Sequence, residues 1–153
     1  MPFLIRPATL DDVDLVVRWN ILLADESEGL QLSPEILAPG VRQALADPQK
    51  ARSFIAMDGP RPIGQTMVTY EWSDWRNGWI WWIQSVYVEA DYRRRGVYRA
   101  LHEHIAETAR RSGVVGLRLY VEQNNAVARE AYQSCGLKPA GYLVYEHMFG
   151  RSG

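Results

Sequence analysis

The chain has 153 residues, of which 47% are hydrophobic and 23% are charged. This length and composition predict one globular domain over residues 1–153, with a core large enough to need no disulfide or metal. Seventeen Lys and Arg residues against eighteen Asp and Glu residues leave a formal net charge of −1. The overall charge therefore argues against nucleic acid or a membrane surface as a partner.

Features that would direct the chain to a membrane or an oxidising compartment are missing from the sequence. The N-terminus lacks the apolar run of a signal peptide, and no stretch reaches the roughly 20 apolar residues that span a bilayer. A single cysteine, Cys135, excludes an intramolecular disulfide and fits a reducing environment. We therefore expect a cytoplasmic protein.

Hydrophobic periodicity and turn signals divide the first half of the chain into two strands and two helices. Thr9 stands where an N-cap is expected, Asp25–Gly29 interrupts the first helical pattern, and Ser33 followed by Pro34 starts the second. The predicted elements are a strand at 3–6, a helix at 10–24, a helix at 34–46 and a strand at 53–57.

The second half begins with a predicted hairpin. Residues 63–72 and 79–88 are rich in β-branched and aromatic residues, and the turn between them ends in Asn77-Gly78. Further along, the pattern predicts a helix from about 97 to Gly113, a strand at 117–121, a helix at 125–134, and one bent or two short strands over Lys138–Met148. Helices interspersed with strands in this order indicate a mixed α/β sheet.

A basic turn between the second hairpin strand and the following helix carries the clearest chemical signal. Arg93, Arg94, Arg95 and Gly96 stand directly before the helix, and Arg99 lies in its first turn. A helix start offers unpaired N–H groups and the positive end of the dipole to an anion, and glycine lets the backbone approach closely. Arginine adds bidentate donors. This pattern predicts a pyrophosphate site, although an isolated basic helix start is more often only solvated.

The segment Arg93-Arg94-Arg95-Gly96-Val97-Tyr98 resembles the GCN5-related N-acetyltransferase (GNAT) signature, Gln/Arg-x-x-Gly-x-Gly/Ala, which follows a Val-rich strand. It departs from that signature at Tyr98, which replaces a small residue and is expected to crowd one side of the loop. The resemblance implies an acyl-CoA N-acyltransferase fold with a mixed, mostly antiparallel sheet of six to seven strands and about four helices. It also implies that acetyl-CoA is the cosubstrate.

The resemblance assigns the cosubstrate contacts to three groups of residues. The strand backbone would pair with the pantetheine arm and the acetyl carbonyl, the basic turn would hold the pyrophosphate, and a second motif would reach the pantetheine and the thioester. The residues so assigned are Val86, Tyr87 and Val88; Arg93, Arg94, Arg95, Gly96, Val97, Tyr98 and Arg99; and Asn125 and Tyr132.

That second motif is Asn125 to Tyr132 followed by Gly136-Leu137, which resembles the family's Asn-x-x-Ala-x-x-x-Tyr-x-x-x-Gly-Phe segment with Leu in place of Phe. It implies that Tyr132 lies near the sulfur and protonates the departing thiolate. A phenol with a pKa of about 10 is protonated at neutral pH and suits this role. The N–H of Val88 would stabilise the oxyanion formed during direct attack by an amine.

The general base and the acceptor are less well determined. Relatives often place a glutamate on the strand before the loop, and that strand has none here. Glu28 and Glu71 are the preferred candidates for catalysis and for contacting a cationic acceptor, with Glu26 and Glu122 as alternatives. Each is otherwise an ordinary surface carboxylate, and a water chain without a dedicated base is a further option.

Several tryptophans of the predicted hairpin suit an acceptor with an ammonium group and an apolar body, so we expect a small-molecule amine. The alternatives are acetylation of a protein or peptide N-terminus and a noncatalytic acyl-CoA sensor. A Trp-rich sheet edge also suggests a homodimer. The spacing of the three histidines predicts no metal site.

Overall fold

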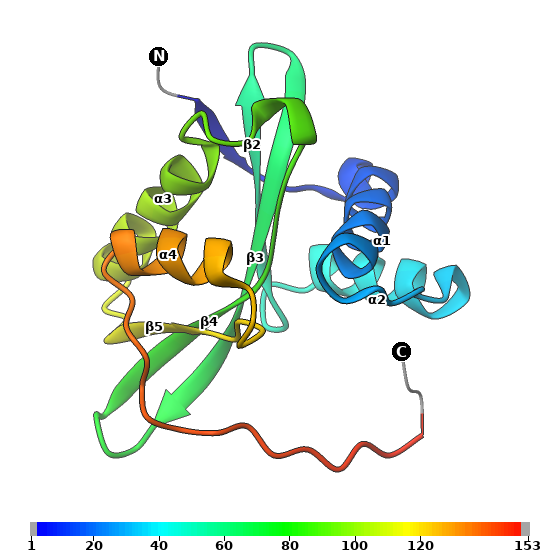
Figure 1. Ribbon diagram of the computed structural model, residues 1–153. Helices are drawn as coiled ribbons and strands as arrows, with labels where there is room; N and C mark the ends of the chain where they lie inside the picture. The colour runs from blue at the N-terminus through cyan, green and yellow to red at the C-terminus, as the bar shows by residue number, and fades with distance from the viewer. Residues whose placement is uncertain (1–2, 151–153) are drawn as a thin grey trace.

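The computed structural model describes residues 3–150, which form one five-stranded sheet with α1 and α2 on one face and α3 and α4 on the other (Figure 1). The strands are β1 Leu4–Pro7, β2 Arg52–Asp58, β3 Arg61–Ser73, β4 Gly78–Val88 and β5 Gly116–Leu119. The helices are α1 Val13–Glu28, α2 Pro34–Ala46, α3 Val97–Arg111 and α4 Ala126–Ser134, with the short 3-10 helices η1 Leu10–Asp12 and η2 Ala90–Tyr92. Within residues 3–150, no helix has both the length and the apolar content to cross a membrane.

The strands follow the order β1-β2-β3-β4-β5, antiparallel except for the parallel pair β4 and β5. The mixed α/β class, the mostly antiparallel pairing and the four helices agree with the prediction. The expected count of six to seven strands is wrong for the described residues. The difference lies in Lys138–Met148, which forms no strand and is exposed throughout because no neighbouring strand pairs with it.

A charged cap fixes the entry into α1. The Asp12 carboxylate accepts hydrogen bonds from the Thr9 N–H at 2.8 Å and from both terminal nitrogens of Arg6 at 2.9 Å. The Thr9 hydroxyl accepts a hydrogen bond from the Asp11 N–H at 3.3 Å, so Thr9 is the N-cap of η1, as the sequence predicts. These bonds join the end of β1 to the start of α1, and the hydrogen bond from Arg6 is the main reason that the pKa of Asp12 is lowered.

Helix α1 continues one turn further than the sequence predicts. The polar run after Ala24 stays helical, and the helix ends only at Gly29, whose φ of 65° lets its N–H reach the Asp25 carbonyl. The extra turn matters for the site because it carries Glu26 and Ser27.

Two faces of apolar side chains hold the helices on the sheet. On the α1 and α2 face, Trp19 is fully buried among Val13, Val16, Val41, Ile55 and Tyr87. On the α3 face, two clusters gather residues of β2, β3, β4 and α3: Phe54, Val68, Trp81, Ile83, Ile105 and Ala109, and Ala56, Ile63, Tyr92, Val97 and Leu101. Trp81 is therefore part of the core and does not line the cavity.

Strand β4 contains one residue more than β3 near the middle of the hairpin. Ser85 and Ile83 lie opposite the adjacent residues Met67 and Val68, so Gln84 has no partner. An extra residue of this kind bends a strand and increases its twist. The pairing of β4 with β5 ends at Ile83, so within residues 3–150 no strand pairs with the remainder of β4 on that side.

The Asp12 cap should stabilise the fold in a pH-dependent way. We expect Asp12→Asn to lower the free energy of unfolding by about 2 kcal/mol at pH 7, because the buried carboxylate holds Arg6 and the Thr9 N–H. A lowered folded-state pKa stabilises above the ordinary aspartate pKa of about 3.9 and loses that effect as the pH falls through the folded-state value. Urea unfolding of both proteins at pH 7 and at a series of lower pH values should show a difference that shrinks as the pH falls below about 3.9. A difference that persists in acid would contradict this account.

Candidate active site

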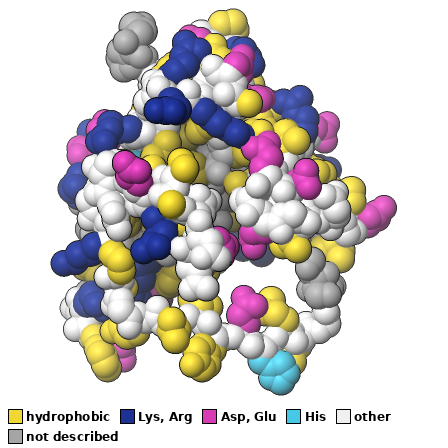
Figure 2. Space-filling model, viewed as in Figure 1, with side chains coloured by type: hydrophobic (Ala, Val, Ile, Leu, Met, Phe, Trp, Pro, Cys, Tyr) yellow, Lys and Arg dark blue, Asp and Glu magenta, His cyan; other side chains and the backbone are white. Residues whose placement is uncertain are grey.

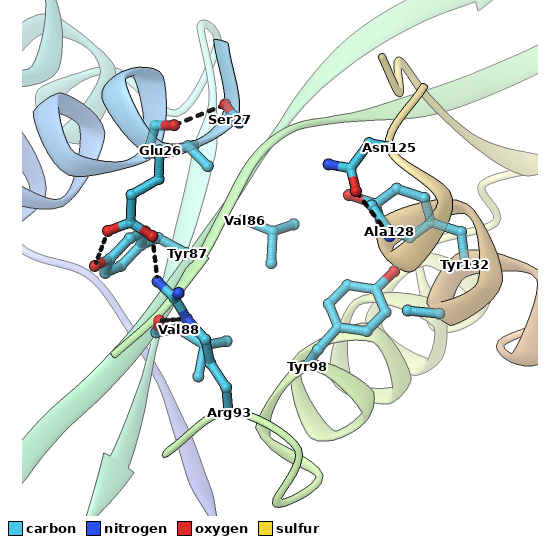
Figure 3. Close-up of a pocket in the computed structure, with 12 residues that line it drawn as sticks. Glu26, Ser27, Val86, Tyr87, Val88, Arg93, Tyr98, Asn125, Ala128 and Tyr132 are labelled. Atoms are coloured by element: carbon cyan, nitrogen blue, oxygen red, sulfur yellow. Dashed lines mark hydrogen bonds and ion pairs between the residues drawn. The ribbon is translucent and has the colours of Figure 1, made fainter. Parts of the chain in front are cut away.

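A cavity of about 320 Å³ opens between the C-terminal end of α1, the part of β4 beyond the bulge, and helices α3 and α4 (Figure 3). The space-filling view shows the molecule hollowed between these elements, with Lys and Arg side chains gathered above the hollow (Figure 2). The cavity is lined by Leu23, Glu26, Ser27, Val86, Tyr87, Val88, Arg93, Tyr98, Asn125, Ala128, Ala131 and Tyr132. The cavity therefore brings together the predicted strand, the Asn–Tyr motif, and Arg93 and Tyr98 of the basic segment. The other predicted residues of that segment, Arg94, Arg95, Gly96, Val97 and Arg99, do not line it.

The bulge turns one edge of β4 toward this cavity. The N–H of Glu89 donates to the Ile63 carbonyl at 2.9 Å, and hydrogen-bonding directions alternate along an antiparallel strand. Val86 and Val88 therefore point their N–H and C=O groups away from β3, into the opening. The Val88 carbonyl accepts a hydrogen bond from Nε of Arg93 at 2.9 Å. An extended ligand could pair with the remaining groups as an added strand does.

Helix α3 begins with an uncapped N-terminus beside this edge. Its N-cap, Gly96, has a φ of 86° and makes no side-chain cap, and the first turn contains no acidic residue. Arg94 also has a positive φ, of 62°. Left-handed residues around a turn curl the backbone so that its N–H groups face a concavity that suits an anion. The geometry of this turn therefore suits a pyrophosphate, as the sequence pattern predicts.

The arginines of the turn have different surroundings. Arg95 stacks on the Tyr92 ring with its guanidinium carbon 4.3 Å from the centroid, and Arg99 lies 4.0 Å from Glu103. Arg93 is exposed, but its guanidinium is tied to the Val88 carbonyl and to the Glu26 carboxylate. Arg94 is exposed and takes part in none of the hydrogen bonds or ion pairs found in the described part of the chain. It is thus the arginine most free to meet a ligand.

A network of polar contacts joins α1 to β4 on one wall of the cavity. Glu26 accepts hydrogen bonds from Arg93 at 2.7 Å and from the Tyr87 hydroxyl at 3.1 Å (Figure 3). Next to it, Glu89 accepts from the indole Nε1 of Trp19 at 2.9 Å and from Arg18 at 3.3 Å. Burial, followed by the bond to Glu26, raises the pKa of Tyr87. This wall is therefore tied at four points.

The opposite wall carries two tyrosines. The rings of Tyr98 and Tyr132 lie edge to face with their centroids 5.4 Å apart, and Figure 3 shows both across the cavity from Glu26. The Tyr98 hydroxyl is 3.4 Å from Nδ1 of His102. Burial raises the pKa of both tyrosines. The residue that replaces a small one in the GNAT-like signature thus lies in the cavity wall and supports Tyr132.

Asn125 positions α4 as well as facing the cavity. Its side-chain oxygen accepts a hydrogen bond from the Ala128 N–H at 3.1 Å and so caps the helix. The amide nitrogen is left to donate to a ligand. Spacings of three and four residues place Ala128, Ala131 and Tyr132 on one helix face, and the same spacing in α1 aligns Leu23, Glu26 and Ser27. These alignments are the sequence signal from which the additional lining residues could have been found.

The preferred acidic candidates do not line the cavity. Glu71 accepts from Nε1 of Trp82 at 2.7 Å and pairs with Arg118 at 3.1 Å; the Trp82 hydrogen bond is the main cause of its lowered pKa. Glu28 is exposed at the end of α1. Glu122 accepts from the backbone of Asn124. Of the four acids considered from the sequence, Glu26 is the one that the structure brings into the cavity. The described residues contain no group of three or more side chains suited to hold a metal ion.

Most of the chain matches a known protein family. Residues 18–137 match the Acetyltransferase (GNAT) family, which is most of the chain. The protein belongs to the GNAT family. A solved GNAT-like structure, described as a possible acetyltransferase from Clostridium difficile 630, is 38% identical, covers 99% of this chain and 100% of its own, and has a TM-score of 0.90.

Two curated GNAT relatives match shorter parts of the chain. Thialysine N-epsilon-acetyltransferase of Caenorhabditis elegans is 32% identical over 53% of this chain and 50% of its own length. The [ribosomal protein bS18]-alanine N-acetyltransferase of Escherichia coli K12 is 39% identical over 37% of this chain and 38% of its own. The alignments span half or less of these enzymes, so they support the family and not a particular acceptor.

The left-handed turn before α3 should be visible in stability measurements. A Cβ at Gly96 meets nothing within 4 Å, so Gly96→Ala should cost only the backbone strain of its φ of 86°, about 1 to 2 kcal/mol. Gly40 also has open space but lies inside α2 without a positive φ. There, Gly40→Ala should stabilise by about 0.5 to 1 kcal/mol. Urea unfolding of both variants should give opposite signs; equal signs would rule out the strained turn.

Proposed function

We propose that this protein transfers the acetyl group of acetyl-CoA to the primary amine of a small molecule by direct attack, with Tyr132 as the general acid. The observation that carries this proposal is that one cavity is lined by the open edge of β4 and by Tyr132, and reaches the first turn of the uncapped helix α3 at Tyr98. The strand edge can hydrogen-bond an extended arm, the helix N-terminus can bind an anion, and Tyr132 can protonate a leaving thiolate. Family membership supports acetyl-CoA as the cosubstrate.

The residues divide the binding of acetyl-CoA among them. The turn from Arg94 to Gly96, with the first N–H groups of α3, would hold the pyrophosphate. The free edge of β4 at Val86 and Val88 would pair with the pantetheine amides. Across the cavity, the amide nitrogen of Asn125 would donate to the same arm. Arg93 has a different role in this proposal, because its bonds to Val88 and Glu26 brace the strand that binds the arm.

The chemical step needs a neutral amine, and an alkylamine has a pKa of about 10.4, so the nucleophile must lose a proton before or during attack. The nitrogen forms a bond to the acetyl carbon, and the carbonyl oxygen gains negative charge that the Val88 N–H stabilises. As the carbon–sulfur bond breaks, Tyr132 gives its proton to the thiolate. Burial raises the pKa of Tyr132, which keeps the donor protonated at neutral and moderately alkaline pH.

The acceptor amine would enter beside the last turn of α1. Glu26 lines the cavity there but is paired with Arg93, so the negative charge for a cationic acceptor would come from Glu28, which lies exposed two residues further on. Glu71 is a weaker candidate as base or as cation contact, because Arg118 already neutralises it and its pKa is lowered. We assign no dedicated base, and a water molecule would carry the proton from the amine to solvent.

An N-terminal alanine of a protein is the second candidate acceptor. The similarity to the bS18-alanine acetyltransferase favours it, although the match covers 38% of that enzyme. A noncatalytic acyl-CoA sensor would keep the binding cavity but would not need the hydroxyl of Tyr132. An activity assay that offers small primary amines and a peptide with an N-terminal alanine in parallel distinguishes the small-molecule acetyltransferase, the protein acetyltransferase and the noncatalytic sensor.

Calorimetry with acetyl-CoA tests the cosubstrate site. We expect Arg94→Ala to weaken binding about tenfold, equivalent to about 1.4 kcal/mol, and Gly96→Glu to abolish it by placing negative charge and bulk at the helix start. Arg110→Ala, at the other end of α3 and also exposed, is the matched control and should leave binding unchanged. A folded wild type that does not bind acetyl-CoA would overturn the proposed function.

Kinetics of thiol release test the role of Tyr132. Tyr132→Phe should lower kcat about 100-fold or more and leave the acetyl-CoA Kd within about twofold, because only the proton donor is lost. Wild-type kcat should show no tyrosine ionisation below about pH 10, since the raised pKa of Tyr132 keeps it protonated. Tyr98→Phe, which removes the neighbouring hydroxyl, should keep kcat near wild type. If Tyr98→Phe has the larger effect, Tyr98 and not Tyr132 is the acid.

A further inference from the structure

The hydroxyl of Tyr132 is not tied to another polar group in the described part of the chain, and burial alone raises its pKa. Tyrosines of β4 and η2 are held differently. Tyr87 donates a hydrogen bond to Glu26, and Tyr92 donates one to Asp58. A carboxylate bound in this way would compete with a leaving thiolate for the phenol proton. The orientation of Tyr132 must therefore come from contacts of its ring.

Helix α4 does not supply these contacts itself. Its half-buried residues are Ala128, Ala131 and Tyr132, and its other residues are exposed. An alanine side chain is too small to fix the direction of a neighbouring ring. The ring that Tyr132 meets belongs to Tyr98 of α3, and Figure 3 shows the two on the same side of the cavity. Their centroids lie 5.4 Å apart with 64° between the ring planes, which is the edge-to-face arrangement that aromatic pairs favour.

Tyr98 stands on a firmly packed part of the protein. It lies in the first turn of α3, and its neighbours Val97 and Leu101 are buried in the core against the sheet. One turn further along α3, His102 is only 7% exposed. Its ring centroid is 5.9 Å from that of Tyr98, and its Nδ1 is 3.4 Å from the Tyr98 hydroxyl. The buried His102 therefore limits where the Tyr98 ring can move.

The GNAT-like signature has a small residue at the position of Tyr98, and a small side chain would present no ring edge to Tyr132. This chain therefore has a contact that the signature does not provide. The contact lies where it has the greatest effect, because among the described residues the hydrogen bond that joins α3 to α4 is the 3.4 Å bond from Arg99 to Ser134.

We propose that Tyr98 is a positioning residue for the general acid: its ring, supported by His102, holds the hydroxyl of Tyr132 toward the leaving thiolate. The inference rests on the acetyl transfer and on the role of Tyr132 proposed above. The effect resides in the ring of Tyr98, so the hydroxyl can be removed without loss. Acetyl-CoA binding does not need this ring, since the signature has a small residue here.

A double-mutant cycle tests whether Tyr98 acts through Tyr132. Thiol release is measured with acetyl-CoA and the fastest acceptor among the small amines and the alanine peptide. Tyr98→Ala should lower kcat about 10- to 100-fold, the cost of a misplaced catalytic group, and change the acetyl-CoA Kd by no more than about threefold. His102→Ala should lower kcat by a smaller factor. In a Tyr132→Phe background, Tyr98→Ala should have no further effect, because the group that it positions is gone.

Three kinetic results would overturn the proposal. The first is a wild-type kcat for Tyr98→Ala. The second is an equal loss of kcat with and without the Tyr132 hydroxyl, which would mean that Tyr98 acts by another route. The third is a Tyr98→Phe variant as slow as Tyr98→Ala, which would assign the effect to the hydroxyl of Tyr98 and not to its ring.

NMR of the free protein tests the ring contact without turnover. The tyrosine rings are isotope-labelled, and the Tyr132 signals are assigned as those lost in Tyr132→Phe. An aromatic neighbour shifts the signals of a ring that it contacts. Tyr98→Leu should therefore move the Tyr132 signals toward those of Tyr145, which is 88% exposed, while Tyr98→Phe should leave them in place. Leucine keeps apolar bulk and favours a helix, so this variant serves even if Tyr98→Ala does not fold. Unmoved Tyr132 signals in Tyr98→Leu would contradict the proposal.

The proposed function and this inference fail in different ways. If no amine is acetylated, or if Tyr132→Phe keeps the wild-type kcat, the proposed function fails and the inference fails with it. If Tyr132→Phe is slow and Tyr98→Ala is as fast as the wild type, the inference alone fails.

Discussion

The extra residue in β4 is the constraint on which the site depends. Gln84 has no opposite residue in the register of β3, and the part of the strand that follows it does not pair with β5. This one irregularity changes which side chains face each helix layer. Trp81 and Ile83 pack toward α3 before the bulge, whereas Val86 packs there after it, and Tyr87 joins Trp19 on the α1 face. Because β5 also ends opposite Ile83, the part of β4 beyond the bulge presents a free edge to the cavity.

Electrostatics then divide the basic turn into two functions. Arg93 and Glu26 form an ion pair that is more than two-fifths exposed on both sides, so it contributes little to global stability. Its value lies in position, because it fixes the carbonyl of Val88 and the end of α1 together. Arg94 forms no hydrogen bond or ion pair within the described residues, and no side chain caps the N–H groups at the start of α3. The turn therefore combines an internal brace with an anion site within a few residues.

Much of this arrangement can be derived from the sequence because its signals are local. The Asn77-Gly78 turn, the amphipathic pattern of α3 and the Gly96 turn each depend on neighbouring residues, and the two GNAT-like motifs placed Tyr132 and the turn at one site. What could not be derived depends on contacts between distant residues. Gln84 carries no bulge signature of its own. Glu71 is neutralised by Arg118, which is 47 positions away.

The predictions of the end of α1 and of a strand over Lys138–Met148 are wrong for different reasons. The run from Asp25 to Glu28 is polar, which suggests a loop, but Gly29 supplies the left-handed stop and makes a further helical turn favourable. Lys138–Met148 has the composition of a strand, yet it forms none in the described structure. Periodicity indicates that a segment suits a sheet, but it does not show whether a neighbouring strand is in place to pair with it.

The two walls of the cavity differ in how firmly they are held, and this has a consequence for the evolution of selectivity. The wall of α1 and β4 is tied by the bonds of Glu26 and Glu89 around the fully buried Trp19. The α4 wall, which has no buried residue, touches α3 through the Tyr98–Tyr132 pair and a 3.4 Å bond from Arg99 to Ser134. Substitutions on α4 can thus change the width of the cavity without disturbing the sheet. Descendants of this chain would diversify in the acceptors they take by remodelling the loose wall, while the rigid wall preserves the chemistry.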